Sequence, residues 1–333
     1  MKIYELDDGP SVEDDLWDAT ELLNEAKSLD SPGQPPFDYE RIVRDFENRN
    51  ASSWKSSMWA VRNAKRLTAY AYLDMPTLEN TGTALIRLTV HPDYRRRGIG
   101  SAFLRTLLPV AEAAGRTRVL GSVREDGPGM AWATEAGFSA VHGFIQQELV
   151  FAEADPAIWD VPVAEGYELR EWVGPAPEEL LGPFAAARQA IHDAPSGKLS
   201  YDDPTWTPER VREEEAEMAA TGIEWRVVVA VRRSDGAVAG LTETQFDDSS
   251  PRQAHQGDTS VVVEHRGLGL GRAMKAAMLR KLRNELPEVL RIRTQTAADN
   301  HYMAQVSRQV GYRDLWVTQY VEADLADVRR VLG

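Results

Sequence analysis

The sequence contains no cysteine and only 6 histidines among its 333 residues. Without cysteine there is no disulfide, no thiolate nucleophile and no thiolate-ligated zinc site. The histidines are scattered and form neither an H-x-x-x-H nor an HExxH arrangement, which are spacings that place two metal ligands on one helix face. We therefore expect no cysteine-based chemistry and no bound metal.

Long apolar runs are also missing. No stretch approaches the roughly 18 consecutive apolar residues that a membrane-spanning helix requires. The first residues, MKIYELDDGPSVEDD, are acidic and lack the basic start and the apolar run of a signal peptide. These features predict a cytoplasmic protein without a membrane partner.

Positive charge is in short supply, with 38 Lys and Arg against 52 Asp and Glu, a formal net charge of −14. Binding to nucleic acid requires a basic surface that neutralises phosphates, so we expect no nucleic-acid partner. A local basic loop can still bind one small polyanion. At about 100–200 residues per domain, the length predicts two folded domains.

An internal repeat supports the division into two. ALIRLTVHPDYRRRGIGSAFLRTLL begins at residue 84, and GDTSVVVEHRGLGLGRAMKAAML begins at residue 257. Each has an apolar strand-like run, a turn with arginine, a pair of glycines and a helical pattern. Arg95 corresponds to Arg266, an offset of 171, and Phe138 corresponds to Tyr312, an offset of 174. Two landmarks that agree this closely indicate a duplicated domain.

The predicted domains are residues 1–155 and 164–333, separated by the acidic, proline-containing segment EADPAIWDVPVAEG. In each copy we expect a strand, one or two helices, three strands, a long helix, a strand, a short helix and a pair of strands. Helical and strand periods alternate, which predicts an α/β (α+β) fold, a mixed and mostly antiparallel sheet flanked by helices.

The long helix of the second copy has a clear apolar periodicity. Met274, Ala277, Met278 and Leu282 recur at spacings of three and four and should face the core. The same periodicity turns four basic residues outward: Arg272, Lys275, Arg280 and Lys281. Pro287 should end this helix, whereas Pro109 in the first copy predicts a kink or an early end.

A glycine loop lies between a strand and the long helix in each copy. The pattern Arg-x-x-Gly-x-Gly comprises Arg95, Gly98 and Gly100 in the first copy, and Arg266, Gly269 and Gly271 in the second. A helix N-terminus offers unpaired N–H groups and partial positive charge, and glycine lets a ligand approach the backbone. Together with the arginines, such a loop suits a pyrophosphate.

Three other kinds of loop fit these glycines less well. A P-loop requires GxxxxGK followed by Ser or Thr, which neither copy contains. The Rossmann fingerprint requires a third glycine or alanine, and Met274 occupies that place. A tight turn without a ligand would account for a single copy, but it explains less well why two copies match.

At these residues the chain resembles the GNAT superfamily of N-acetyltransferases. LTVHPDYRRRGIG and SVVVEHRGLGLG resemble its acetyl-coenzyme A loop, and TQTAADNHYMAQVSRQVGY resembles its closing strand and helix. The tandem layout is similar to that of mycothiol synthase-like proteins. The resemblance implies acetyl-CoA as co-substrate and a splayed pair of strands that receives its pantetheine arm. The implied cofactor-binding residues are Leu88, Val90, Arg95, Arg96, Gly98, Gly100 and Ser101 in the first copy, and Val261, Arg266, Gly267, Gly269, Gly271, Arg272 and Asn300 in the second.

The catalytic residues are harder to assign. Acetyl transfer to an amine needs a base, which the family often places on the strand before the cofactor strand, and Glu243 in VAGLTETQF matches that position. The first copy has Tyr72 there. The family's tyrosine acid is replaced by Ala133 and Ser307, and Ser307 is a poor proton donor, so water or direct release of the thiolate is an alternative.

The segment of residues 191–206, IHDAPSGKLSYDDPTW, links two helical patterns of the second copy. The resemblance implies that this loop lines the acceptor pocket, with a solvated acidic loop as the alternative. The acceptor-site candidates are His192, Asp193, Tyr201, Asp202 and Asp203. Tyr302 lies on a different helical face from Ser307 and is expected to be a packing or acceptor-site residue.

These observations predict an acetyl-CoA-dependent N-acetyltransferase that works by direct attack in a ternary complex. The C-terminal copy is expected to be catalytic and the N-terminal copy degenerate. The acceptor is a small-molecule or peptide amine, and the protein a monomer or weak homodimer. A non-catalytic acyl-CoA-binding or sensor protein is the main alternative, and a nucleotide-binding scaffold is a third.

Overall fold

The structure is a computed structural model that describes residues 2–50, 53–63 and 66–333. Its chain divides into two compact units. Unit 1 contains the chain up to His142, together with Lys198–Asp202 and Thr318–Gly333. Unit 2 contains Gly143–Gly197 and Asp203–Val317. Each unit is an α/β structure with a mostly antiparallel sheet, which confirms the predicted fold class.

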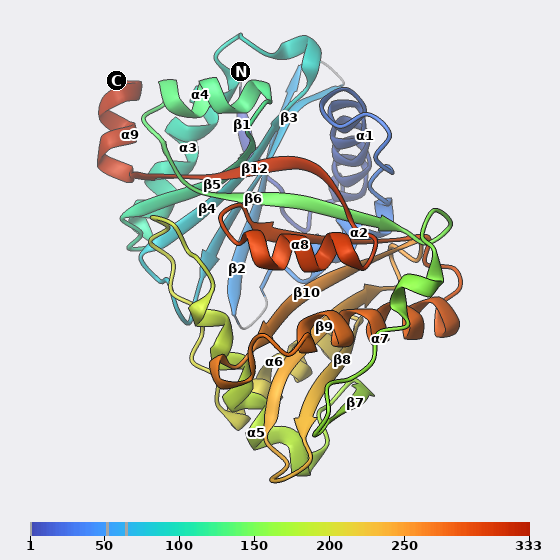
Figure 1. Ribbon diagram of the computed structural model, residues 1–333. Coiled ribbons are helices and arrows are strands. Elements are labelled where there is room, and N and C mark those ends of the chain that lie inside the picture. Colours follow the sequence, from blue (N-terminus) through green and yellow to red (C-terminus); the bar gives the residue numbers. More distant parts are fainter. Residues whose placement is uncertain (1, 51–52, 64–65) are drawn as a thin grey trace. The chain divides into compact units, whose positions relative to one another are not determined.

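Unit 1 is built on a sheet with the strand order β1-β2-β3-β4-β5, followed by the last part of β12. Its pairs are antiparallel except β4 with β5, which is parallel. Figure 1 labels its elements, which are β1 (Ile3–Glu5), α1 (Val12–Asp30), α2 (Tyr39–Glu47), β2 (Trp54–Asn63), β3 (Arg66–Pro76), β4 (Thr83–Val90), α3 (Ile99–Ala113), β5 (Arg118–Arg124), α4 (Pro128–Glu135), β12 (Arg313–Asp324) and α9 (Leu325–Leu332).

The two faces of this sheet are covered by different helices. Along β3, Ala71 and Leu73 pack in one core cluster with α3 and α9. The alternate residues Tyr70 and Tyr72 pack in a second cluster with α1 and α2. This alternation follows from the two-residue period of a strand, and it requires β3 to be apolar on both faces. Tyr72 therefore lies on the face that α1 and α2 cover.

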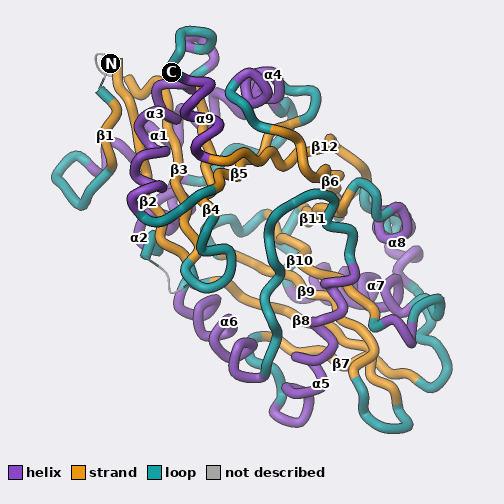
Figure 2. Tube along the Cα trace, turned by 90° about the vertical axis from the view of Figure 1, so that its left-hand side faces the viewer, coloured by secondary structure: helices purple, strands orange, loops and turns teal. Residues whose placement is uncertain are grey.

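Unit 2 repeats this plan with the strand order β6-β11-β10-β9-β8-β7, part of which can be followed in Figure 2. Its pairs are antiparallel except β10 with β11, which is parallel. Its elements are β6 (Ser139–Val150), β7 (Tyr167–Val173), α5 (Glu178–Arg188), α6 (Pro208–Ala220), β8 (Ile223–Arg232), β9 (Val238–Asp247), β10 (Gln253–Val261), α7 (Leu270–Glu285), β11 (Arg291–Ala297) and α8 (His301–Gln309).

The sheet of unit 2 is also covered on both faces. Val228 and Ala230 of β8 pack in a cluster with α7, whereas Val227 and Val229 pack with α5. Val227 is the cross-strand partner of Glu243 on β9. Paired residues of neighbouring strands point to the same face, so the Glu243 side chain lies on the α5 and α6 face.

The closing strands are exchanged between the two sequence copies. Residues Thr318–Asp324 of β12 pair with β5 in unit 1, and Phe144–Val150 of β6 pair with β11 in unit 2. Each copy therefore ends in one long strand, where the sequence predicted a pair of strands. The predicted ranges 1–155 and 164–333 describe the sequence repeat, but the compact units do not coincide with them.

Each unit contains a parallel strand pair that separates after a short ladder. β4 pairs with β5 only over Thr83–Leu85, although β4 continues to Val90. β10 pairs with β11 only over Gln253–His255, although β10 continues to Val261. The far end of each strand thus has backbone groups turned toward a gap in the ladder, the arrangement implied by the family resemblance.

The two prolines and the segment between the copies differ in their effect on the chain. Pro109 lies inside α3 without ending it, because the helix continues to Ala113. The predicted end at Pro287 is confirmed, since α7 stops at Glu285. The predicted linker is exposed or partly exposed over most of its length, but it is anchored by Trp159, which is fully buried and whose indole Nε1 donates to the Val310 carbonyl at 2.9 Å.

The prediction that Lys275 faces outward is wrong. Its side chain is only 2% exposed and lies on α7, a helix with buried residues around most of its circumference. The amphipathic pattern fails as a guide because a helix covered on nearly all sides has no solvent-facing stripe over that stretch.

Candidate active site

The glycine loop of unit 1 turns directly from β4 into α3. Gly98 is the N-cap of α3 and has a φ of +77°, a left-handed conformation that glycine adopts without strain. Arg96 also has a positive φ, +60°. The tight turn directs the first N–H groups of α3 toward the end of β4, where a helix N-terminus favours an anion.

A cavity of about 390 Å³ opens at this turn. Its volume lies within the range of small-molecule sites, about 300–1,000 Å³. All seven cofactor-binding residues predicted for the first copy line it: Leu88, Val90, Arg95, Arg96, Gly98, Gly100 and Ser101. Asp30, Tyr94, Trp132 and Glu135 also line it and were not predicted.

Trp132 forms one wall of this cavity. It lies on α4, and its indole covers Gly100 so closely that a Cβ at Gly100 would be 3.0 Å from ring carbons. The absence of a side chain at Gly100 therefore allows α3 and α4 to approach each other. No motif in the sequence signalled this contact, because the two residues are 32 positions apart (132 − 100).

The loop arginine of unit 1 holds the turn together. Arg95 Nε donates to the Val90 carbonyl at 3.1 Å, and its terminal nitrogens contact the Asp30 carboxylate at 2.8 and 2.6 Å. Such a bidentate pair fixes the guanidinium and neutralises most of its charge. In this structure Arg95 therefore stabilises the loop and does not present a free cation.

The loop arginine of unit 2 makes the equivalent contacts. Arg266 Nε donates to the Val261 carbonyl at 2.9 Å, and its Nη2 contacts Asp193 at 2.6 Å. In both units the acceptor carbonyl precedes the arginine by five residues (95 − 90 and 266 − 261). Asp193 was predicted at the acceptor site, but the structure places it at the cofactor loop.

The remaining loop residues of unit 2 follow the same plan. Gly267 and Gly269 have φ values of +80° and +74°, and Gly269 is the N-cap of α7. Gly271 lies on the Val261 side chain, with 3.8 Å between an added Cβ and its Cγ2. Arg272 is half-buried, and its Nε has no hydrogen-bond partner within the described ranges. These four residues thus surround the N-terminus of α7.

Asn300 has a structural role in unit 2. It is the N-cap of α8, where its side chain accepts a hydrogen bond from the Met303 N–H at 3.1 Å. An asparagine cap satisfies one of the otherwise unpaired N–H groups of a helix. This contact accounts for the residue without a ligand, so its predicted contact with the cofactor remains a prediction.

Glu243 lies at an irregularity of the β9–β10 ladder. Gln256 pairs with Thr244 and Thr259 pairs with Thr242, so that Glu243 faces two residues, Gly257 and Asp258. This is a β-bulge, which breaks the ladder locally and redirects side chains.

The bulge shapes the surroundings of the Glu243 carboxylate directly. The Asp258 N–H donates to Glu243 Oε1 at 3.4 Å, and an added Cβ at Gly257 would be 3.1 Å from that oxygen. A glycine at residue 257 therefore leaves room for the carboxylate against the backbone of β10.

The carboxylate of Glu243 is buried beside one cation. Arg188 at the end of α5 contacts Glu243 Oε1 at 3.7 Å and the Glu214 carboxylate at 2.8 Å. Its guanidinium stacks on Trp206, 3.5 Å from the ring centroid. Glu243 Oε2 has no hydrogen-bond partner among the residues that the structure describes. One carboxylate oxygen is thus available to a further group.

The surroundings change the acidity of Glu243. Burial raises its pKa from 4.5 to about 8, Arg188 opposes this rise, and the charges of Asp258 and Glu214 add to it. Burial likewise raises the pKa of Asp258 and of Glu214. A carboxylate with a pKa near neutrality is suited to accept and return a proton, and such groups concentrate at functional sites.

The opposite face of the β9–β10 pair carries a second, neutral network. Gln256 Nε2 donates to Thr242 Oγ1 at 2.7 Å and to the Glu243 carbonyl at 2.8 Å. Its Oε1 accepts from the Tyr312 hydroxyl at 3.3 Å, and its carbonyl accepts from Thr294 Oγ1 at 3.1 Å. This buried network fixes the backbone beside the bulge and thereby the position of Glu243.

Unit 1 has a different arrangement at the equivalent place. Tyr72 pairs directly with Arg87, and the register of this ladder is regular from Ala69–Val90 to Asp74–Leu85. Arg87 lies over the Tyr72 ring, 4.1 Å from its centroid, and contacts Asp74 at 3.0 Å. Burial raises the pKa of Tyr72 to about 12, so its hydroxyl stays protonated and is no base at neutral pH.

The structure places the other predicted catalytic residue, Ser307, inside α8. It is completely buried, and its hydroxyl has no hydrogen-bond partner in the described part of the chain. Tyr302 on the same helix is 61% exposed, so it is not a packing residue. Neither residue is brought to Glu243 by a contact that the structure records, and the role of Ser307 as a proton donor remains a prediction.

The predicted acceptor-loop residues are divided between the units. Asp202 belongs to unit 1, where its N–H donates to Asn80 Oδ1 at 2.7 Å, and Tyr201 precedes it there. His192 Nε2 lies 3.1 Å from the Pro204 carbonyl in unit 2. The charge of Asp203 contributes to the raised pKa of Asp258, so Asp203 is the candidate that lies in the field of the Glu243 site.

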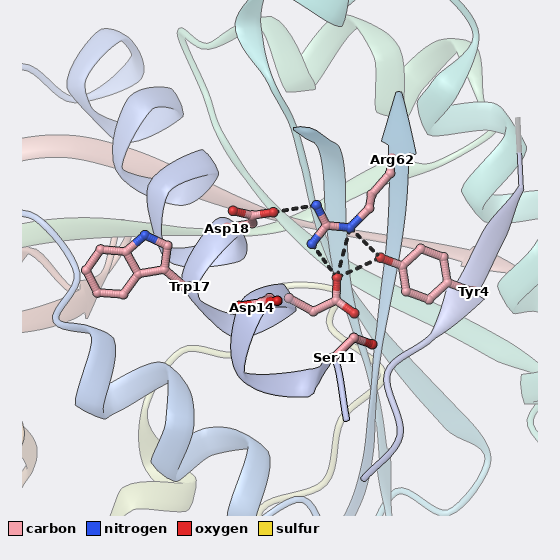
Figure 3. A pocket seen from close by; sticks show the side chains of 7 residues that line it. Tyr4, Ser11, Asp14, Trp17, Asp18 and Arg62 are labelled. Atoms are coloured by element: carbon pink, nitrogen blue, oxygen red, sulfur yellow. Dashed lines mark hydrogen bonds and ion pairs between the residues drawn. The ribbon is translucent and has the colours of Figure 1, made fainter. Parts of the chain in front are cut away.

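A second cavity in unit 1 measures about 540 Å³ and is lined by Tyr4, Ser11, Asp14, Asp15, Trp17, Asp18 and Arg62 (Figure 3). Arg62 contacts Asp15 at 2.6 Å and also pairs with Asp18, and the Tyr4 hydroxyl donates to Asp15 at 2.8 Å. Arg62, Tyr4, Asp15 and Asp18 thus satisfy one another, and we assign no role to this cavity.

Among the residues that the structure describes, no group of three or more His, Asp or Glu side chains could hold a metal ion. No helix within them has both the length and the apolarity to cross a membrane.

Comparison with known proteins gives a consistent family match. Residues 16–138 and 191–312 each match the acetyltransferase (GNAT) family, which covers more than half of the chain in two repeats. The matched ranges contain both glycine loops and Glu243.

Curated relatives include mycothiol acetyltransferases. That of Mycolicibacterium paratuberculosis is 30% identical over 146 residues, 44% of this chain and 42% of the relative. That of Tsukamurella paurometabola is 26% identical over 212 residues, 60% of this chain and 65% of the relative. The chain thus spans less than two thirds of the length of these relatives.

Solved structures share the whole architecture. A tandem GNAT protein from the clavulanic acid biosynthesis pathway, solved without acetyl-CoA, is 25% identical with a TM-score of 0.79, covering 97% of this chain and 98% of its own. A GCN5-related N-acetyltransferase from Sphaerobacter thermophilus is 15% identical with a TM-score of 0.74, covering 97% and 95%. The second likeness concerns the fold alone.

Proposed function

Because the chain belongs to the acetyltransferase (GNAT) family, we propose that this acyltransferase moves an acetyl group from acetyl-coenzyme A to an amine. The proposal is carried by the surroundings of Glu243, a buried carboxylate with one unpartnered oxygen. Glu243 lies opposite a bulge in β10, the strand that leads into the α7 glycine loop. This arrangement puts a proton acceptor beside the middle of β10 and an anion-binding helix N-terminus beyond the end of that strand.

The residues of both glycine loops fit the coenzyme. In each unit an αL glycine caps a long helix, and the preceding strand has left its parallel partner. The N–H groups of the helix suit a pyrophosphate, and the free strand edge suits the amides of a pantetheine arm. When bound, the coenzyme supplies an activated thioester.

Within unit 2, Glu243 is assigned the role of general base. In its ionised form it takes a proton from the acceptor amine, through Oε2 or through one water. The amine then attacks the acetyl carbonyl directly in a ternary complex. A covalent acyl-enzyme is not proposed, because the sequence has no cysteine and no serine motif with an adjacent base.

We assign turnover to unit 2 and coenzyme binding without turnover to unit 1. Unit 1 has the 390 Å³ cavity at its glycine loop, so its cofactor side is open. Its acceptor side has Tyr72 and Arg87 packed against each other in a regular ladder without a bulge, and the neighbouring carboxylate of Asp74 is paired with Arg87. The N-terminal copy is thus degenerate in chemistry while it keeps its ligand site.

The test combines binding and turnover. Calorimetric titration of the intact protein with acetyl-CoA should show saturable binding near the micromolar range, about −8 kcal/mol. Arg266→Glu, which destroys the contacts to Val261 and Asp193, should remove the event in unit 2 and leave the event in unit 1. Arg95→Glu is the matched variant and should do the reverse.

Turnover is followed as the release of free thiol from acetyl-CoA with a panel of amines. Because the relatives are mycothiol acetyltransferases, the amine acceptor of that reaction belongs in the panel. Activity that disappears in Glu243→Gln and persists in Glu213→Gln, an exposed neighbour on α6, would support the proposal. Saturable binding without any thiol release would instead favour the acyl-CoA-binding alternative.

A further inference from the structure

We propose that Asp258 and Glu243 together receive the acceptor as a positively charged primary ammonium group, with Asp258 holding the ammonium and Glu243 taking its proton. This inference rests on the proposed function and narrows the substrate class to cationic amines. Asp258 is then a binding residue of the acceptor site, a role that no motif in the sequence assigned to it.

The geometry of the bulge places the two carboxylates together. Asp258 is one of the two residues that face Glu243, and its own N–H reaches Glu243 Oε1 at 3.4 Å. Residues 257–259 are partly exposed, whereas Glu243 is 4% exposed. Asp258 therefore lies at the solvent side of the pair, where an incoming group meets it first.

The charges around the pair leave room for one cation. Carboxylates face the site from three elements: Glu214 from α6, Asp203 from the loop before it and Asp258 from β10. Arg188 from α5 is the cation that contacts Glu243, and it also pairs with Glu214, while Arg210 acts on Glu214. Acids thus outnumber bases, and a buried excess of negative charge is relieved either by protonation or by a bound cation.

The free oxygen of Glu243 points to the ligand independently of this charge count. The Glu243 side chain is only 5% exposed, and its Oε2 has no hydrogen-bond partner in the described structure. A buried, unsatisfied carboxylate oxygen is costly unless a donor occupies it in some state of the protein. An ammonium group brings three donors, enough for both carboxylates.

The equivalent positions in unit 1 have the opposite character. With the repeat offset of 171, Glu243 corresponds to Tyr72 and Asp258 corresponds to Arg87. Arg87 covers the Tyr72 ring and pairs with Asp74, so a cation of the chain already occupies this place. The carboxylate pair at residues 243 and 258 is thus present in one copy of the fold only and is not required by the fold.

The proton balance of the step is complete. The ammonium gives one proton to Glu243 and becomes a neutral amine, whose lone pair forms the N–C bond to the acetyl carbon while the C–S bond breaks. The second proton leaving the nitrogen ends on the thiolate sulfur, directly or through water. Glu243 returns its proton to solvent, so that the products are the acetamide, the thiol and one proton.

The experiment measures binding of benzylamine against benzyl alcohol, a neutral probe of similar shape, by ligand-observed NMR on the full chain with coenzyme A present. The wild type should prefer benzylamine by about tenfold or more, and Asp258→Asn should reduce the preference to within about twofold. Asp258→Glu should retain it, as should Asp248→Asn, an exposed acid on the β9–β10 turn. Unchanged affinity for acetyl-CoA shows that each variant is folded.

Two results would overturn the inference: a wild type without preference for the amine, or an Asp258→Asn variant that keeps the full preference. The proposed function is judged separately from thiol release. If no amine is acetylated while the ammonium preference depends on Asp258, the transferase proposal fails and the ammonium site stands. If turnover occurs and Asp258→Asn changes neither the KM for cationic amines nor the pH profile, the ammonium site fails and the transferase stands.

Discussion

Replacing Lys275 by methionine should stabilise the protein at neutral pH. The Lys275 side chain is buried in α7, and burial lowers its pKa from 10.5 to about 7. Within the described residues its ammonium makes no ion pair or hydrogen bond, and the Tyr312 ring lies 5.2 Å from Nζ. Methionine keeps the length and apolar stem of the side chain and removes the group that loses its hydration.

The size and the pH dependence of the effect follow from the pKa. Between pH 7 and 10.5 the unfolded chain binds a proton that the folded protein does not, so wild-type stability rises with pH across this window. Below pH 7 both states are protonated and the whole penalty is present. The difference between 10.5 and about 7 corresponds to at most ~5 kcal/mol. We expect Lys275→Met to add ~2–4 kcal/mol near pH 6 and progressively less toward pH 10.

The assay is urea unfolding followed by circular dichroism at pH values of about 6, 8 and 10. Lys281→Met is the matched control on the same helix. Burial lowers the pKa of Lys281, but its pairs with Glu171 and Glu285 outweigh this and raise the pKa overall. Lys281→Met should therefore lose at most ~1 kcal/mol of unfolding free energy, mainly below the pKa of the lysine. An unchanged or lower stability of Lys275→Met at pH 6 would refute the reasoning, because it would mean that the amine is satisfied in the folded state.

Three further predictions concern the site itself. In a pH-rate profile, the kcat/KM of the wild type should fall about tenfold per pH unit below about pH 8, because Glu243 becomes protonated there. Glu243→Gln should be slower by a factor of about 10²–10⁴ and should lack this acidic decline. Gly257→Ala should lower kcat without changing the Kd of acetyl-CoA, because its Cβ would be 3.1 Å from the Glu243 carboxylate. Gly182→Ala, whose Cβ would have nothing within 4 Å, should leave kcat unchanged, and equal kcat values for the two variants would contradict this. Trp132→Ala should weaken one of two acetyl-CoA binding events by about tenfold in calorimetry, and two unaffected events would show that the indole is no part of the coenzyme site.

The cofactor loops could be predicted because the residues that define them are close together in the sequence. The end of the strand, the turn and the start of the helix lie within residues 88–101, and each part has its own signal in periodicity or glycine. All seven residues predicted for the first copy line one cavity for this reason. Gly98 and Gly269 could be assigned to turns from the sequence alone, because few other residues adopt their conformation without strain.

The surroundings of Glu243 could not be predicted in the same way. Arg188 and Asp258 reach it through strand register, helix packing and a bulge, which depend on contacts between segments far apart in the chain. A single inserted residue on β10 decides which side chain faces Glu243, and a strand pattern does not reveal such an insertion. Lys275 was placed wrongly because its helix is covered by other elements on almost every side.

The exchanged closing strands have a consequence for biosynthesis. The β5–β12 pairing of unit 1 joins residues separated by 194 (318 − 124) to 206 (324 − 118) positions. During translation, the β5 edge of the sheet therefore stays unpaired until the whole second copy has been made. An exposed edge of this kind can pair with another chain. A nascent chain that stops between the two copies lacks the last strand of its sheet. Separating the two copies at the sequence boundary would therefore leave the sheet of each unit without its closing strand.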